Sequence, residues 1–167
     1  MNFKLKTLSP EAVVRSLAKA ERYRLLNEPG EAHSICLDVL ASEPQNQEAL
    51  ATLLLAVTEQ FVEDAAFVAE AWAIVARMRG DYARAYFSGI VCERRAKAMR
   101  QNNTRGYGPY VYGWLRDAMN WYEKAEAIHP PGNEDALLRW NACARLIMRD
   151  HLLVPMSEER AEPLLLE

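Results

Sequence analysis

The side chains best suited to binding a metal ion are few in this chain and lie far apart. They are His33, His129 and His151 together with Cys36, Cys92 and Cys143. Only His33 and Cys36 have the three-residue spacing that places two ligands on one face of a helix. A structural zinc site needs about four such ligands, so this pair does not make a site, and we expect no metal.

The sequence also lacks the patterns that position a nucleophile or a phosphate group. No serine stands in the Gly-x-Ser-x-Gly turn that exposes a catalytic hydroxyl. Gly106 and Gly108 precede Pro109, without the full glycine pattern or the preceding strand of a phosphate-binding loop. Paired acids at 63–64 and 134–135 fall at expected helix starts, where acids stabilise the helix dipole. No catalytic constellation can be assembled, so we expect neither an enzyme nor a cofactor.

One segment, residues 94–116, combines cations with aromatic side chains. Its members are Arg94, Arg95, Lys97, Arg100 and Arg105, followed by Tyr107, Tyr110, Tyr112 and Trp114. Such a surface could bind nucleic acid or an acidic peptide. The alternative is a solvated helix end, where cations favour the dipole, followed by aromatics that pack locally. Because the net charge of the whole chain is −3, and nucleic-acid-binding domains are normally basic, we rank nucleic acid second as a partner.

Opposite charges are separated along the chain. Residues 25–76 contain nine acids and no Lys or Arg, whereas residues 77–116 contain nine basic residues and two acids. The small net charge therefore conceals two blocks of opposite sign. Fields of this kind steer binding partners more than they stabilise a fold.

The elements that must position these residues are helices, and two of them are clearest between residues 113 and 148. Apolar residues recur there every three or four positions, on both sides of a break at Pro130-Pro131-Gly132. The two sets are Leu115, Ala118, Met119, Tyr122, Ala125 and Ile128, then Ala136, Leu137, Trp140, Cys143, Ala144 and Ile147. This period predicts two amphipathic helices.

The same spacing of small and large residues occurs twice. Ala118, Tyr122, Ala125 and Pro130 are matched by Ala32, Cys36, Val39 and Pro44, and Ala20 with Tyr23 stands where a preceding helix would lie. This pattern resembles the tetratricopeptide repeat, a hairpin of two helices about 34 residues long. The resemblance is most specific in a first and a third unit and covers most of residues 10–150. A second unit between them is degenerate.

The repeat predicts an insertion in the third unit, since Gly89 and Ala118 lie 29 positions apart where Ala20 and Ala32 lie 12 apart. We assign the extra residues to 97–113 and expect a surface excursion, with a loop at 102–109.

Residues 47–79 contain neither Gly nor Pro, but the repeat predicts a turn near residues 59–63. Ser9 and Asn46 are expected to cap helices.

The resemblance implies an all-α fold of about seven helices, stacked as antiparallel hairpins in a short right-handed superhelix. The domain would span residues 1–154 and be followed by a tail at 155–167. In tetratricopeptide proteins the first helix of each unit lines a concave groove. Carried over by alignment, this gives as partner-binding residues Arg24, Tyr86, Ile90, Arg94, Lys97, Asn141 and Arg145. The carboxylate clamp of some members is not supported, because the second unit offers Glu48, Ala51, Leu55 and Thr58 instead.

The function implied by the resemblance is that of a scaffold or adaptor that binds a protein or peptide, with acidic segments as candidates. The alternative is a nucleic-acid-associated factor that uses residues 94–116. Asn141 lies on an otherwise apolar helix, and it is either a core amide bonded to a neighbouring helix or a groove residue that contacts a peptide backbone.

Composition is that of a water-soluble domain, with 50% apolar and 26% charged residues. The uncharged run at 49–57 is far too short to cross a bilayer, and no secretory signal is visible at the start. We therefore expect a cytoplasmic protein without membrane contact, whose isolated cysteines are buried and reduced.

The tail ends in Pro163 and three leucines. It either docks on this chain or on a second copy, which would give self-association, or it is a frayed end.

Overall fold

The structure is a computed structural model that describes residues 3–103 and 105–156, and it is all-α. Within these residues a short 3-10 turn, η1 (Pro10–Ala12), precedes seven helices, and no strand is present. The helices are α1 (Val13–Leu25), α2 (Pro29–Ser42), α3 (Gln47–Glu59), α4 (Phe67–Ala76), α5 (Asp81–Gln101), α6 (Gly108–Glu126) and α7 (Asp135–Arg149). The predicted fold class and number of helices are confirmed.

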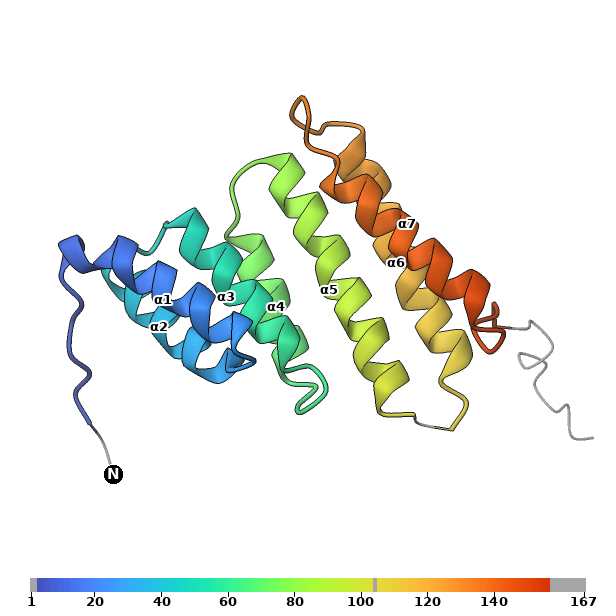
Figure 1. Cartoon of the computed structure of the whole chain (residues 1–167), viewed down its shortest axis with the longest axis horizontal. Coiled ribbons are helices and arrows are strands. Elements are labelled where there is room, and N and C mark those ends of the chain that lie inside the picture. Colours follow the sequence, from blue (N-terminus) through green and yellow to red (C-terminus); the bar gives the residue numbers. More distant parts are fainter. Residues whose placement is uncertain (1–2, 104, 157–167) are drawn as a thin grey trace, which may run out of the picture.

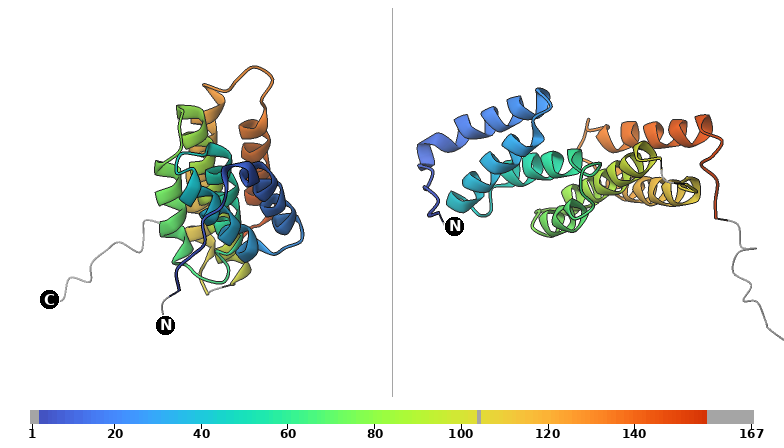
Figure 2. Two further views of the ribbon diagram at one scale, coloured as in Figure 1. Left: turned by 90° about the vertical axis from the view of Figure 1, so that its left-hand side faces the viewer. Right: turned by 90° about the horizontal axis from the view of Figure 1, so that it is seen from below.

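The helices follow one another as antiparallel neighbours along an elongated molecule, with α1 and α7 at opposite ends (Figure 1). Each helix contacts the next one in the chain, and α3 also contacts α1 and α5. The side and end views in Figure 2 show the same succession of hairpins. This arrangement surrounds α3 with neighbours, and nearly all of its side chains between Ala49 and Thr58 are buried.

Most predicted helix boundaries are confirmed. The Asn46 side chain accepts a hydrogen bond of 2.8 Å from the backbone N–H of Ala49 and so caps α3. Residues 60–66 separate α3 from α4, as the repeat predicted for this glycine-free stretch. The prediction for Ser9 is wrong. Its hydroxyl makes no capping bond, and the chain passes through η1 before α1 begins.

The expected excursion at residues 97–113 is mostly helical. Residues 97–101 form the last turn of α5, residues 108–113 begin α6, and only 102–107 connect the two helices. Accordingly α5 and α6 have 21 and 19 residues, whereas α1 and α2 have 13 and 14. The loop predicted at 102–109 is therefore close to the connection that the structure has, whereas the wider excursion expected over 97–113 is wrong for most of its residues. Lys97, Ala98, Met99 and Arg100 all favour helices, which explains why α5 continues.

The apolar core has two parts. The first is formed by α1 to α4 and receives Val91 and Ala98 from α5. The second is formed by α5, α6 and α7, with Leu153 beyond the last helix. Trp72 of α4 packs against both parts. Since α5 contributes to both cores, it joins the two halves of the molecule.

The chain returns over the start of α6 after α7 ends. Leu153 is buried there, and the backbone carbonyl of Leu152 lies so close to Gly108 that a side chain at Gly108 would collide with it. Residues 150–154 therefore belong to the packed domain. The tail predicted at 155–167 lies outside the described residues from 157 onward, and its docking falls there.

Candidate binding surface

Glu93 is a charged residue in the middle of the buried face of α5. It lies four residues after Gly89 and three before Ala96, both of which are buried, and its side chain is only 1% exposed. Burying an ionised carboxylate is costly unless charged and hydrogen-bonding partners surround it. The partners of Glu93 come from three helices.

Both oxygens of the Glu93 carboxylate are occupied. Oε2 accepts a hydrogen bond of 2.6 Å from the Tyr122 hydroxyl of α6. Oε1 accepts from Lys97 Nζ, one turn further along α5, and from Arg139 Nη1 of α7 at 3.3 Å. Burial alone would raise the pKa of Glu93, but Lys97, Tyr122 and Arg139 outweigh it and hold the pKa below its ordinary value. The carboxylate is therefore ionised at neutral pH.

A close helix contact places Tyr122 where it can reach Glu93. The Tyr122 ring lies directly on Gly89, and a Cβ added to Gly89 would be 2.6 Å from Cδ1 of that ring. Tyr122 is fully buried, and its only polar atom is satisfied by Glu93. The small residue at position 89 thus lets α5 and α6 approach and brings the hydroxyl to the carboxylate.

Two cations emerge at the surface above this buried carboxylate. The side chains of Lys97 and Arg139 are 47% and 31% exposed, and both contact the same oxygen, so their charged heads are neighbours. Lys has three N–H donors and Arg has five, so most of these donors remain for another acceptor. One carboxylate balances only one of the two charges. The cluster is therefore locally positive and can hold an anionic group.

Aromatic side chains extend this site along α5. Tyr82 and Tyr86 stack with ring centroids 5.9 Å apart, and Tyr86 lies 6.0 Å from the ring of Tyr122 beneath. The Tyr82 hydroxyl donates to Asn133 Oδ1 at 3.0 Å, which ties α5 to the connection before α7. Both tyrosines are half-buried. We name Tyr82, Tyr86, Lys97 and Arg139 the α5–α7 surface.

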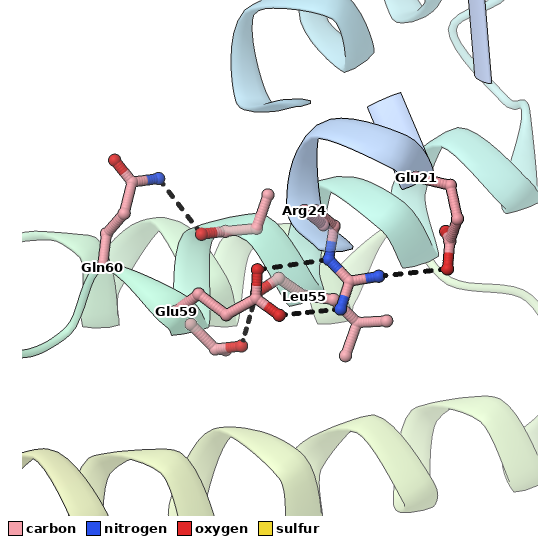
Figure 3. Close-up of polar contacts among 7 residues, drawn as sticks. Glu21, Arg24, Leu55, Glu59 and Gln60 are labelled. Atoms are coloured by element: carbon pink, nitrogen blue, oxygen red, sulfur yellow. Dashed lines mark hydrogen bonds and ion pairs between the residues drawn. The ribbon is translucent and has the colours of Figure 1, made fainter. Parts of the chain in front are cut away.

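Among the residues predicted to bind a partner, Tyr86 and Lys97 lie in the α5–α7 surface. Arg24 lies elsewhere and is engaged within the protein (Figure 3). Its Nη2 and Nε bind the two oxygens of Glu59 at 2.7 and 3.2 Å, and Nη1 lies 3.5 Å from Glu21. This fork of hydrogen bonds joins α1 to α3.

The other predicted residues do not gather with this pair. Ile90 is fully buried, so it belongs to the core. Arg94 is half-buried, and its Nε has no hydrogen-bond partner within the described part of the chain. Asn141 borders a shallow pocket of about 320 Å³ between α6 and α7, beside Glu123 and Trp140. Arg145 is exposed on α7.

Sequence reasoning missed Glu93, Arg139 and Tyr82 as members of the site. A signal was present for Glu93, because it is a lone acid in the register of Gly89 and Ala96 on a helix rich in cations. Arg139 likewise falls between Ala136 and Cys143 on the inner stripe of its helix. An acid on the inner face of one helix and a base on the inner face of another therefore indicate a buried ion pair between the two helices.

The charge blocks seen in the sequence remain unpaired with each other in the fold. The acidic block lies on α2, α3 and α4, and the basic block on α5 and the start of α6. Among the described residues no ion pair joins the acids of 25–76 to the cations of 77–116. The positive field of α5 is therefore available to a partner.

Of the side chains considered as metal ligands, His33 pairs with another side chain and the three cysteines are buried in the core. His33 Nε2 lies 3.0 Å from Glu70, and the described residues contain no cluster of three His, Cys, Asp or Glu that could hold a metal ion. Cys36, Cys92 and Cys143 are buried and unbridged, as predicted, and burial raises the pKa of each thiol to about 12. These thiols are unreactive at neutral pH.

No helix in the described part of the chain is both long enough and apolar enough to span a membrane. Comparison of the chain with protein families, with curated proteins and with solved structures gives no match. The resemblance to tetratricopeptide proteins thus rests on the residue pattern alone.

Proposed function

We propose that this protein is a protein-binding module that holds an acidic segment of its partner on the α5–α7 surface. The observation that carries the proposal is the pair of cations, the exposed Lys97 and the partly exposed Arg139, which a single buried carboxylate holds side by side. Because Glu93 and the helix contacts hold these groups before a partner arrives, little side-chain entropy is lost on binding. A carboxylate of the partner would supply the missing negative charge.

The aromatic part of the surface supports a peptide as the ligand. Tyr82 and Tyr86 offer apolar ring area next to the cations, and tyrosine and arginine are enriched where proteins bind one another. The resemblance to tetratricopeptide proteins, in which first helices line a groove, supports the same surface, since α5 and α7 occupy that place. The basic block, which forms no ion pair with the acidic block among the described residues, would steer acidic segments toward it.

Selection of binders from a random peptide library, followed by affinity measurements in solution, tests the proposal. Selected peptides should be rich in Asp and Glu, and replacing Lys97 by Gln should weaken their binding by about tenfold, with a reduced dependence on salt. Lys19→Gln is the matched control, because Lys19 is an exposed lysine of α1 at the far end of the molecule. Equal binding by both variants, or selected peptides without acids, contradicts the proposal.

A further inference from the structure

A second concave site lies at the opposite side of α5, where two connections of the chain meet. It has a volume of about 410 Å³ and is bordered by the α3–α4 connection, the last turns of α5 and the start of α6. Arg95 and Met99 of α5 and Asn102 directly after it line the pocket, at the four- and three-residue spacing of one helix face. We call it the connection pocket. Because Arg95 is about 200° around the helix from Glu93, the pocket is separate from the α5–α7 surface.

Local backbone geometry builds the walls of this pocket. Asn103 and Gly106 have φ values of 47° and 78°, which turn the chain sharply between α5 and α6. The side-chain amide of Asn102 donates to the Val62 carbonyl at 3.4 Å and so ties the two connections together. The start of α6 is held by the close contact of Gly108 with Leu152. These contacts hold the two ends of the α5–α6 connection, at Asn102 and Gly108, and place the connection beside the one between α3 and α4.

The pocket is positively charged. Arg95 and Arg105 line it, and neither guanidinium forms a hydrogen bond or ion pair with another of the described residues. Glu63 is its one acidic lining residue among those described. A guanidinium presents a planar fork of donors that matches the oxygens of a phosphate group. Arg95 and Arg105 each present such a fork, and neither is paired with a carboxylate of the described residues. The pocket therefore favours a phosphorylated ligand over a neutral one.

Aromatic and apolar groups complete the lining. Tyr107 is half-buried and Tyr110 is 58% exposed, and Met99 and Phe61 add apolar surface. Proteins that bind single-stranded nucleic acids combine aromatic rings, on which the bases stack, with cations that hold the phosphates. The Glu63 carboxylate can accept hydrogen bonds from an exocyclic amino group or from ribose hydroxyls.

We infer that the connection pocket binds one nucleotide unit, with its base against the tyrosines and its phosphate on Arg95 and Arg105. The volume lies within the range of small-molecule sites, about 300–1,000 Å³, and is too small for a folded partner. The nucleotide is either free in solution or part of a single-stranded RNA, since both present the same base and phosphate. This inference is independent of peptide binding on the α5–α7 surface.

Titrations of the full chain with adenosine monophosphate, uridine monophosphate, adenosine and a short single-stranded RNA test the inference. We expect saturable binding of the nucleotides, weaker binding of adenosine because it lacks the phosphate, and chemical shift changes at Tyr107 and Tyr110. Arg105→Ala and Tyr110→Ala should each weaken nucleotide binding by about tenfold, and both residues are exposed, so the fold is retained.

Two control variants separate this site from others. Arg116→Ala removes an exposed cation of α6 that does not line the pocket, and Lys97→Gln removes a cation of the α5–α7 surface, which likewise does not line the pocket. Both should bind nucleotides as the unmodified protein does. RNA binding much tighter than nucleotide binding assigns the site to RNA, and equal affinities assign it to free nucleotides. No saturable binding up to about 1 mM, or equal losses in the Arg105 and Arg116 variants, overturns the inference.

Discussion

Glu93 packs in the interior between three helices and also holds the two cations of the proposed binding surface. Replacing a buried ion pair by apolar groups of similar volume is often neutral or stabilising, so stability alone does not explain a carboxylate at this position. Its three partners come from α5, α6 and α7, and two of them are exposed cations. The carboxylate fixes the positions of Lys97 and Arg139, which free side chains at the surface would not keep.

The first prediction concerns the charge of Glu93. Glu93→Gln keeps the size of the side chain but removes the charge, so we expect a loss of about 1–3 kcal/mol in the free energy of unfolding at pH 7. The pKa of Glu93 is lowered in the folded state, so its contribution is present above the unfolded pKa of about 4.3 and is lost as pH falls through the lower folded value. Denaturant titrations at several pH values measure this difference.

Asp38→Asn is the control for this experiment, because Asp38 is exposed on α2. It should change the free energy of unfolding by less than about 0.5 kcal/mol at neutral pH. A difference between the Glu93→Gln variant and the unmodified protein that stays constant down to pH 3 would show that charge is not responsible.

The second prediction compares two glycines in neighbouring helices. Gly89→Ala places a Cβ against the Tyr122 ring and should destabilise the protein by about 1–3 kcal/mol. Gly113→Ala adds a Cβ with no atom within 4 Å inside α6, so it should stabilise by about 0.5–1 kcal/mol. Thermal unfolding of both variants measures the effects. Shifts of the same sign would contradict the close α5–α6 contact.

At the scale of helices, Ala118 and Ala127 test the register of α6. Ala118 is fully buried between helices, whereas Ala127 is exposed at the end of α6. Ala118→Leu should therefore cost about 1–3 kcal/mol through overpacking, and Ala127→Leu should have little effect. Equal changes in melting temperature would undermine the assigned register.

The connections between helices differ in how firmly they are held, which predicts where a protease cuts first. Trypsin should cleave after Arg105, in the exposed connection at 102–107. In the connection between α4 and α5, the backbone N–H of Arg79 donates to Gln47 at 2.7 Å and Met78 is buried, so cleavage there should be slower. Mass spectrometry of early fragments decides the order. A first cut after Arg77 or Arg79 would contradict the prediction.

The helices could be predicted because their signals are local. The period of apolar residues places Ala118, Tyr122 and Ala125 inside, and all three are buried. Asn46 caps α3 through a bond to a residue only three positions away. The loop within 97–113 could be placed because turn residues are concentrated there, but the flanking residues continue the helices on both sides, so the excursion is shorter than expected.

The site could be predicted only in part, because its contacts join distant positions. Glu93 is 29 residues from Tyr122 and 46 from Arg139, and no spacing rule in the sequence connects them. The alignment with tetratricopeptide grooves places Arg24 and Ile90 toward a groove. Arg24 is instead bonded to Glu59, 35 residues away, and Ile90 packs in the core.

For the whole molecule, the central question is how its two halves are coupled. Each half has its own apolar core, and α5 supplies residues to both. In arrays of helical hairpins, stability is approximately the sum of unit and interface contributions, so a weakened interface allows the parts to unfold separately. Trp72 is the half-buried side chain of α4 that packs against both cores.

We therefore expect Trp72→Ala to uncouple the halves as well as to lower stability. The variant should lose about 2–4 kcal/mol in the free energy of unfolding, and its urea transition should broaden, with a smaller m value, because α1–α4 and α5–α7 no longer unfold together.

Trp121→Ala is the matched control, since Trp121 is also half-buried but packs only against the second core. It should lower stability and keep the m value. Hydrogen exchange followed by mass spectrometry should show unequal protection of the two halves only in the Trp72 variant. A single transition with an unchanged m value in that variant would mean that contacts of α5 alone are sufficient to couple the two cores.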